Sequence, residues 1–270
     1  METEYSNKAK DLIENGYTII KNPFTSKVLN SLDSFFDRNL EFFNNNDPYD
    51  DFGLPHNVKN GILFDVYQRY PIFRDFAACS EIGEVLKPVL GDHIFLYENS
   101  LVYSPAFEST VVPWHQDFQN RNDEPVKYIA FIAIDHLKSN SGALRVLKGS
   151  HKLGFLPYRI KKGQGHHTGI PEESYKTLNT SDLDIIEQSP GDILIFNQLI
   201  VHSIPSWCSN SLGRGIRFSY QGFDEMYTPR LSPITIFGGS PCNFNQAFKK
   251  SIKVKNNSSK LKTFFKNKIK

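Results

Sequence analysis

Two histidines and one aspartate in this chain have the types and the spacing of a metal site. His115 and Asp117 are separated by one residue, and His202 follows 87 residues after the first histidine. Residues i and i+2 of a β-strand point to the same face, so His115 and Asp117 would project together while Gln116 points away. Two imidazoles and a carboxylate can bind one face of an octahedral metal and leave its other positions open, as in non-haem Fe(II) oxygenases. We therefore predict an iron site, although an H-x-D pair is common by chance and needs support from its surroundings.

Short strand-like segments surround the three residues. They are rich in aromatic and β-branched residues, and each is too short for a buried helix. The segments are 95–103, 127–135, 143–147, 193–196 and 214–221. Clusters of Ser, Gly and Pro separate them, and many short strands with such turns predict a sandwich or a barrel, of which the jelly roll is one form.

The N-terminal part of the chain is expected to contain most of the helices. A helix is predicted from about residue 6, then a strand at 17–20, and then a second helix from 25 to about 45. A further helix is predicted over 73–90, with a break near Pro88 because proline lacks the N–H that an interior helical position needs.

The chain resembles the phytanoyl-CoA dioxygenase family of Fe(II)/2-oxoglutarate-dependent oxygenases over roughly residues 10–225. The segments that carry the resemblance are Leu12–Lys21, Trp114–Asp117, Ile134–His136, Gly142–His151, Pro190–Phe196 and His202. The resemblance implies a mainly β protein with flanking helices, built on a double-stranded β-helix (a cupin-like jelly-roll barrel) that the N-terminal helices buttress. It also implies that His115, Asp117 and His202 are the metal ligands.

The family further implies an arginine that binds the distal carboxylate of 2-oxoglutarate through two parallel hydrogen bonds, a task for which lysine lacks the planar fork. Arg214 and Arg217 are the candidates, and their separation of three places them on opposite faces of a strand. The family's usual distance from the second histidine favours Arg214, twelve residues after His202. The family's Arg-x-Ser pattern favours Arg217 with Ser219, and we favour Arg217.

Two further residues, Asn99 and Phe131, fall where family members often have co-substrate contacts. The alternative is that both are ordinary strand residues that face a core. The retained carboxylate of Asp117 favours hydroxylation over halogenation, because related halogenases have a small residue at this ligand position.

By resemblance, the chain is an enzyme that uses Fe(II), 2-oxoglutarate and O2 to hydroxylate a C–H bond of a small molecule, with release of succinate and CO2. One alternative is a cupin-like metalloenzyme that does not use 2-oxoglutarate. Another is a non-catalytic copy of the fold that serves as a binding or scaffold module, which the intact ligand set opposes. Nothing in the sequence selects the substrate.

The charge distribution divides the chain into residues 1–247, expected to form a single dioxygenase domain with its barrel core at about 95–225, and a basic tail at 248–270. The tail holds nine lysines and no acidic residue, and without it the formal charge changes from +2 to −7. An acidic body argues against nucleic-acid binding. We expect a flexible, solvated tail, with contact to an anionic membrane surface as the alternative.

The compartment is inferred from the cysteines and from the apolar segments. Three scattered cysteines form neither a disulfide framework nor a zinc motif, which favours reduced thiols in a cytoplasmic protein. No apolar run approaches the ~20 residues of a transmembrane helix, and charged residues near the N-terminus exclude a signal peptide over that segment.

Overall fold

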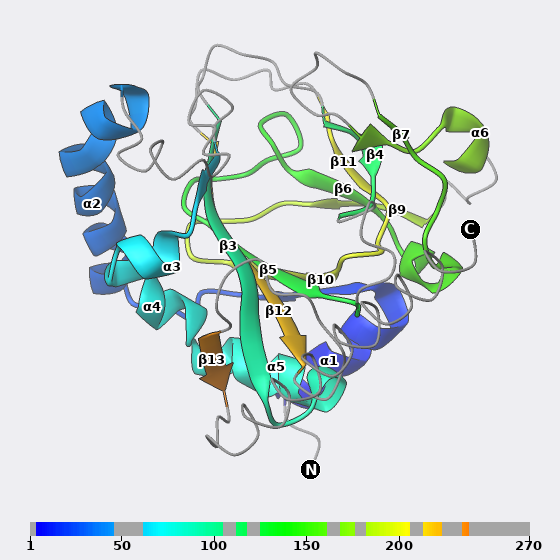
Figure 1. Cartoon of the computed structure of the whole chain (residues 1–270), viewed down its shortest axis with the longest axis horizontal. Coiled ribbons are helices and arrows are strands. Elements are labelled where there is room, and N and C mark those ends of the chain that lie inside the picture. The colour runs from blue at the N-terminus through cyan, green and yellow to red at the C-terminus, as the bar shows by residue number, and fades with distance from the viewer. Residues whose placement is uncertain are drawn as a thin grey trace, which may run out of the picture.

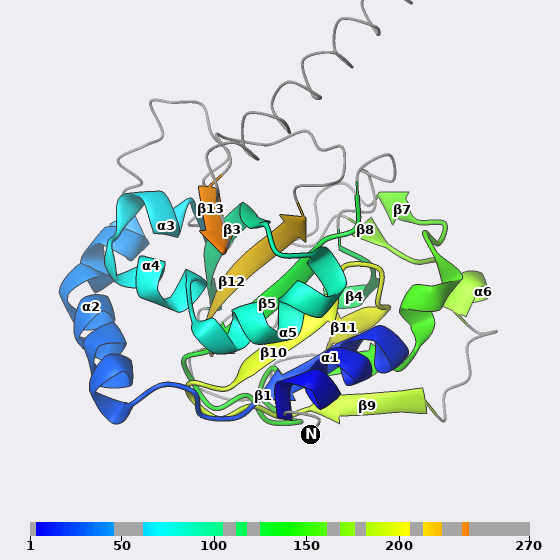
Figure 2. The same cartoon turned by 90° about the horizontal axis from the view of Figure 1, so that it is seen from below.

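The apolar segments of the sequence pair into two antiparallel sheets that face each other, with helices on the outer side of the larger one (Figures 1 and 2). The computed structural model describes residues 4–45, 62–104, 112–117, 125–160, 168–175, 182–205, 213–222 and 234–237. The tail at 248–270 lies outside these ranges. Within them, no helix has the length and apolar character needed to cross a membrane.

The larger sheet has seven strands. Its spatial order is β1 (Tyr17–Ile20), β10 (Ile193–Asn197), β5 (Tyr128–Ala133), β12 (Gly213–Gly222), β3 (Ile94–Ser104) and β13 (Ile234–Phe237), and β2 (Ile62–Phe64) also pairs with β3. The smaller sheet has the order β4 (Val112–His115), β11 (His202–Ile204), β6 (Leu144–Leu147) and β9 (Leu183–Ile186). A separate pair is formed by β7 (Arg159–Ile160) and β8 (Thr168–Gly169).

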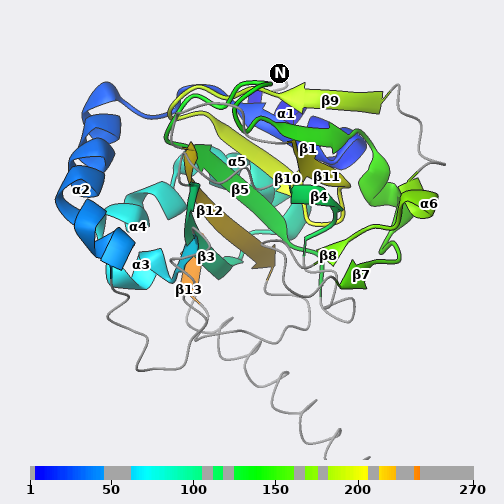
Figure 3. The ribbon, with the colours of Figure 1, turned by 90° about the horizontal axis from the view of Figure 1, so that it is seen from above.

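The helices follow the predicted order, and Figure 3 shows α2 and the neighbouring helices beside one edge of the larger sheet. They are α1 (Glu4–Asn15), α2 (Ser26–Asn45), α3 (Val66–Arg69), α4 (Ile72–Ala77), α5 (Ser80–Leu90) and α6 (Glu172–Tyr175), with a 3-10 turn η3 at Ser150–Leu153. The prediction of one helix over 73–90 that breaks at Pro88 is wrong. The break lies between α4 and α5, where Cys79 is extended (φ −53°, ψ 123°). Pro88 sits in the last turn of α5, so the helical bond that it removes affects only the end of the helix.

The strand β12 separates the two sides of the larger sheet, because its side chains alternate. Ile216, Phe218 and Tyr220 belong to the main apolar core, which includes Phe76 and Leu86 of the helices. The Tyr220 hydroxyl also donates to the carbonyl of Ala77, 2.8 Å away. The intervening residues of β12 therefore face the smaller sheet.

A second apolar cluster fills the space between the sheets. Ile129, Leu194 and Phe196 come from the larger sheet, and Val146 and Ile186 come from the smaller one. The ring of Phe196 lies 5.3 Å from the ring of His202, measured between centroids. The core between the sheets thus extends to one of the predicted metal ligands.

The end of β12 packs so closely against α5 that it has no room for a side chain at Gly222. A Cβ at this position would lie 2.6 Å from the backbone carbonyl oxygen of Leu90. We expect Gly222→Ala to lower the free energy of unfolding by about 1–3 kcal/mol, because the helix or the strand must move. Urea denaturation measures the change.

Gly169→Ala is the matched control, since its Cβ would meet Pro113 at an ordinary contact distance of 3.4 Å. Equal losses of stability in the two variants would contradict the close approach of β12 and α5.

Candidate metal centre

The three predicted ligands converge because β4 and β11 are neighbours in the smaller sheet. His115 and His202 are directly opposite each other in the antiparallel register, and their ring centroids are 4.1 Å apart. Asp117 Oδ1 lies 3.6 Å from His115 Nε2 and 3.8 Å from His202 Nε2. All three ligand atoms lie within 4.8 Å of one another, which suits a single ion.

Both imidazole rings are oriented by backbone carbonyls. Nδ1 of His115 lies 2.9 Å from the carbonyl oxygen of Pro113, and Nδ1 of His202 lies 2.9 Å from that of Ile200. A carbonyl only accepts, so each Nδ1 carries a proton, and Nε2 is the ring nitrogen that faces the candidate site. The sequence did not identify these carbonyls, because any residue type supplies one.

Asp117 reaches the site from a turn and not from the strand, so the prediction that it shares a strand with His115 is wrong. β4 ends at His115. The backbone N–H of Asp117 donates to the carbonyl of Gln198, 2.9 Å away, and this bond holds the turn beside β10. The i, i+2 spacing therefore brings the two side chains together through a turn anchored on a distant strand.

The environment of the site sets the ionisation states of His202 and Asp117. Burial, together with the neighbouring His115, lowers the pKa of His202 to about 3, so its imidazole is neutral. Burial alone would raise the pKa of Asp117, but Arg217 and the two histidines outweigh it and hold this pKa well below its usual range. A neutral His202 and an ionised Asp117 suit a divalent cation such as Fe(II).

The structure places Arg217 beside the candidate metal ligands. Its Nη2 donates to Oδ2 of Asp117 at 2.8 Å, and its Nη1 donates to Oε1 of Glu98 at 3.0 Å. Ser219, two residues further along the inner face of β12, is fully buried. Its Oγ has no hydrogen-bond partner among the described residues. Phe131 is opposite Arg217 on β5 and lies on the same face.

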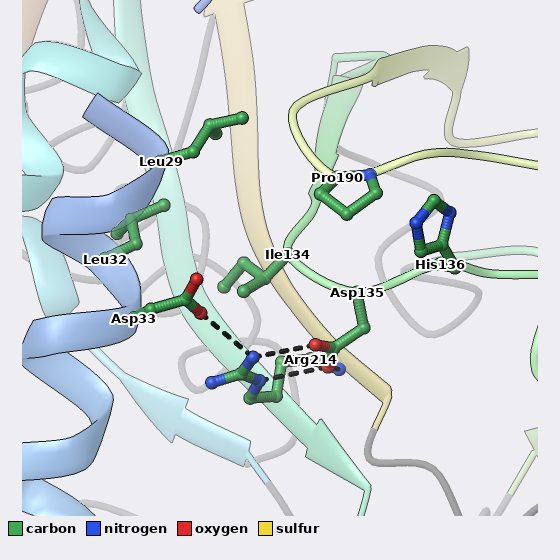
Figure 4. Close-up of a pocket in the computed structure, with 8 residues that line it drawn as sticks. All are labelled: Leu29, Leu32, Asp33, Ile134, Asp135, His136, Pro190 and Arg214. Atoms are coloured by element: carbon green, nitrogen blue, oxygen red, sulfur yellow. Dashed lines mark hydrogen bonds and ion pairs between the residues drawn. The ribbon is translucent and has the colours of Figure 1, made fainter. Parts of the chain in front are cut away.

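Arg214 lies on the other face of β12 from Arg217, and Figure 4 shows its guanidinium directed at Asp33 and Asp135. Its guanidinium donates to both carboxylate oxygens of Asp135, at 3.0 and 2.7 Å, and to Asp33 of α2 at 3.2 Å. It also stacks on Phe36, with 4.7 Å between Cζ and the ring centroid. Arg214 thus joins α2 to the larger sheet and lines a small pocket with Leu29, Leu32, Ile134, His136 and Pro190.

Asn99 also faces the helices. It is opposite Phe218 in the register. Its Oδ1 accepts from the backbone N–H of Tyr67 at 2.8 Å, and its Nδ2 donates to Gln68 at 3.1 Å. Its side-chain amide therefore fixes α3 on the outer side of the sheet, and the structure does not bring it to the metal ligands.

Glu98 is the residue of the site that the sequence analysis missed. It is buried in β3, opposite Ser219, and it pairs with Arg217. An acidic residue in the middle of an apolar strand was the available signal, since a buried carboxylate needs a partner.

Comparisons with known proteins place the chain in a family. The model of the family described as "Phytanoyl-CoA dioxygenase (PhyH)" matches residues 12–204. The ectoine dioxygenase of Sphingopyxis alaskensis is 21% identical over 52% of this chain and 50% of its own length. The peroxisomal phytanoyl-CoA dioxygenase of Rattus norvegicus is 25% identical over 60% of this chain and 49% of its own length. The chain thus spans about half the length of these curated relatives.

Solved structures share the fold. The crystal structure of EctD from S. alaskensis with bound Fe superposes with a TM-score of 0.67 at 16% identity, and covers 83% of this chain and 79% of that one. EvdO2 from Micromonospora carbonacea has a TM-score of 0.66 at 15% identity, over 89% and 96% of the two chains. These are likenesses to double-stranded β-helix proteins, so the predicted fold is confirmed.

The buried, neutral His202 makes the stability of the metal-free protein depend on pH. Its pKa is about 3 in the folded chain and near its ordinary 6.5 in the unfolded chain. Between these values only the unfolded state binds the proton, so the free energy of unfolding falls as the pH decreases from 6.5 towards 3. The slope from one such group is at most about 1.4 kcal/mol per pH unit.

Urea denaturation in the presence of a chelator, across this pH range, measures the slope. His202→Gln should reduce it, whereas His136→Gln, which changes an exposed histidine, should leave it unchanged. An unaltered slope in His202→Gln would contradict the assignment.

Proposed function

This chain belongs to the phytanoyl-CoA dioxygenase family, and on that premise we propose that it is an Fe(II)- and 2-oxoglutarate-dependent dioxygenase. It hydroxylates a C–H bond of a small molecule and releases succinate and CO2. One observation carries the proposal: the guanidinium of Arg217 lies 2.8 Å from a carboxylate that forms a compact ligand set with His115 and His202.

In this proposal His115, Asp117 and His202 hold the iron through two Nε2 atoms and one carboxylate oxygen. Three protein ligands leave three positions of an octahedral ion for exogenous molecules. When bound, Fe(II) and 2-oxoglutarate together supply the oxidising power for the reaction by reducing O2. The protein orients the ligands and keeps their protons on Nδ1, away from the ion.

Arg217 supplies the carboxylate-binding group for 2-oxoglutarate. A guanidinium has five N–H donors. Its two ion pairs with Asp117 and Glu98 engage Nη1 and Nη2. Ser219 adds a buried hydroxyl on the same face of β12, and Phe131 of β5 forms the adjacent wall. By contrast, Arg214 is engaged with Asp135 and Asp33 on the other face of β12.

A second candidate function follows from those same ion pairs. If Arg217 serves only to hold Asp117 ionised and in place, the protein is a metalloenzyme of this fold that does not use 2-oxoglutarate. The two functions make different demands on Arg217. Binding of 2-oxoglutarate needs the two parallel N–H donors of a guanidinium, whereas a single positive charge is enough to keep Asp117 ionised.

Anaerobic titration of the metal-free protein with Fe(II) and then 2-oxoglutarate tests the proposed function. We expect the weak visible charge-transfer band of the chelated complex only after both additions, and we expect no band in His115→Ala. Iron binding without a band on addition of 2-oxoglutarate would favour the second function. Failure to bind iron would favour a non-catalytic role.

Arg217→Lys separates the two roles of this side chain. Lysine keeps the charge beside Asp117 but loses the two parallel hydrogen bonds to a carboxylate. We expect the affinity for 2-oxoglutarate to fall about 30-fold or more, on the scale of a truncated buried charge pair, while Fe(II) affinity changes little. The titration above measures both.

Arg214→Lys is the matched control, because it makes the same chemical change three residues away on the outer face. It should leave 2-oxoglutarate affinity intact. The reverse pattern, with loss in Arg214→Lys alone, would refute the assignment of Arg217.

A further inference from the structure

Glu98 is a buried carboxylate next to the arginine that the proposed function assigns to 2-oxoglutarate. It belongs to β3, its exposed fraction is 7%, and it is directly opposite Ser219 of β12 in the antiparallel register. Residues directly opposite each other in a sheet point to the same face. Glu98 therefore lies on the inner face of the larger sheet, with Ser219 and Arg217.

Arg217 is held at two points by carboxylates that come from the two sheets. Its Nη1 donates to Oε1 of Glu98 at 3.0 Å, and its Nη2 donates to Oδ2 of Asp117 at 2.8 Å. Glu98 belongs to a strand of the larger sheet, whereas Asp117 follows β4 of the smaller one. Because a guanidinium is planar and rigid, two anchored nitrogens fix its orientation. Without Glu98, the group would be free to turn about its hydrogen bond to Asp117.

An aromatic ring limits the position of Arg217 from the side of β5. Phe131 is opposite Arg217 in the register of β5 with β12. A Cβ at Gly215, which is two residues earlier on the same face of β12, would overlap the ring of Phe131, so the ring covers this part of the strand. Since β12 lies between β5 and β3, the side chain of Arg217 is bounded by Phe131 on one side and bonded to Glu98 on the other.

The charge of Glu98 by itself opposes the task proposed for Arg217. A negative charge beside a guanidinium weakens its attraction for another anion, and the effect is strong where water is excluded. As a fixed acceptor, however, Glu98 aligns the N–H donors of Arg217 before a ligand arrives, which removes part of the ordering cost of binding. The two roles therefore predict effects of opposite sign on the affinity for 2-oxoglutarate when Glu98 is removed.

We propose that Glu98 is a positioning residue, which holds the guanidinium of Arg217 in the orientation that receives the carboxylate of 2-oxoglutarate. The inference rests on the proposed function, because it concerns the co-substrate group of that same site. Glu98 acts through Arg217, so its substitution lowers the affinity for 2-oxoglutarate. The affinity for Fe(II) changes little, because Arg217 keeps its charge beside Asp117.

Three variants separate the geometry of Glu98 from its charge. Glu98→Asp keeps the charge but withdraws the carboxylate by one methylene group, and Glu98→Leu removes the acceptor. Each should weaken binding of 2-oxoglutarate about 10-fold or more, the scale on which orienting partners act at metal sites. Glu98→Gln keeps the length and an oxygen acceptor for Nη1, so it should retain more of the affinity than either. Titration of the charge-transfer band in the Fe(II)-loaded protein measures these affinities.

Asp135→Asn is the matched control, because it removes a carboxylate from Arg214, the other arginine of β12, on the outer face. It should lower the melting temperature and leave the affinity for 2-oxoglutarate unchanged. The melting temperature and the Fe(II) affinity show which variants of Glu98 are folded. Glu98→Asp keeps the test decisive if Glu98→Leu does not fold.

A double-mutant cycle tests whether Glu98 acts through Arg217. In the Arg217→Lys background the guanidinium is absent, so Glu98→Asp should cause no further loss of affinity for 2-oxoglutarate. Anaerobic calorimetry of the Fe(II)-loaded proteins measures the four affinities of the cycle. A full additional loss in the double variant would show that Glu98 does not act through Arg217, and would overturn the proposal.

The outcomes distinguish this inference from the proposed function. The positioning role is overturned if Glu98→Asp binds 2-oxoglutarate like the wild type, or if Glu98→Leu binds it more tightly. It is also overturned if Asp135→Asn loses affinity to the same extent, because the loss would then reflect a general destabilisation of β12. A wild-type protein that binds Fe(II) but does not respond to 2-oxoglutarate would remove the proposed function, and this inference with it.

Discussion

The pairing of β4 with β11 is the constraint on which the rest of the site depends. It sets His115 opposite His202, although 87 residues separate them in the chain. The carbonyls of Pro113 and Ile200, each two residues before its histidine, then orient both rings in the same way. Because both orienting bonds are local, the sheet needs only to align the two backbones for the two Nε2 atoms to converge.

The balance of charge at the site is the second constraint. Taking Asp117, Glu98 and Arg217 out of water is costly, and the cost is offset only because the guanidinium bonds both carboxylates. The same pairing keeps Asp117 ionised despite its burial. An arginine on the inner face of β12 thus stabilises a ligand that burial alone would neutralise, whatever else it binds.

Side chains of β12 alternate between the two faces of the larger sheet, and the two faces make different contacts. On its outer face, Arg214 and Tyr220 fasten α2 and α4 to the sheet through hydrogen bonds. On its inner face, Ser219 and Gln221 are buried with unsatisfied polar atoms. Such atoms lower stability, and local rules of folding are broken most often at functional sites. The two faces of β12 therefore differ, with hydrogen-bonded polar groups on the outer face and unsatisfied ones on the inner face.

The sequence by itself determined the mainly β character, the helices that precede the barrel strands and the three residues that converge as candidate ligands. The first two rest on local signals, apolar periodicity and turn residues. The ligand set rests on the i, i+2 spacing of His115 and Asp117 and on the family resemblance, which adds His202. Because side chains alternate along a strand, their separation of three also showed from the sequence that Arg214 and Arg217 face opposite ways. Which face is the inner one was not determined, because β12 is buried on both faces and burial does not distinguish them.

Only the tertiary structure decided which residues come into contact across the strands and helices. It directed Asn99 to α3, brought Glu98 to Arg217, and moved Asp117 from the predicted strand into a turn held by Gln198. The physical reason is that each of these contacts depends on the register between strands. The register is set by pairing over the whole sheet and cannot be read from the sequence of any single segment.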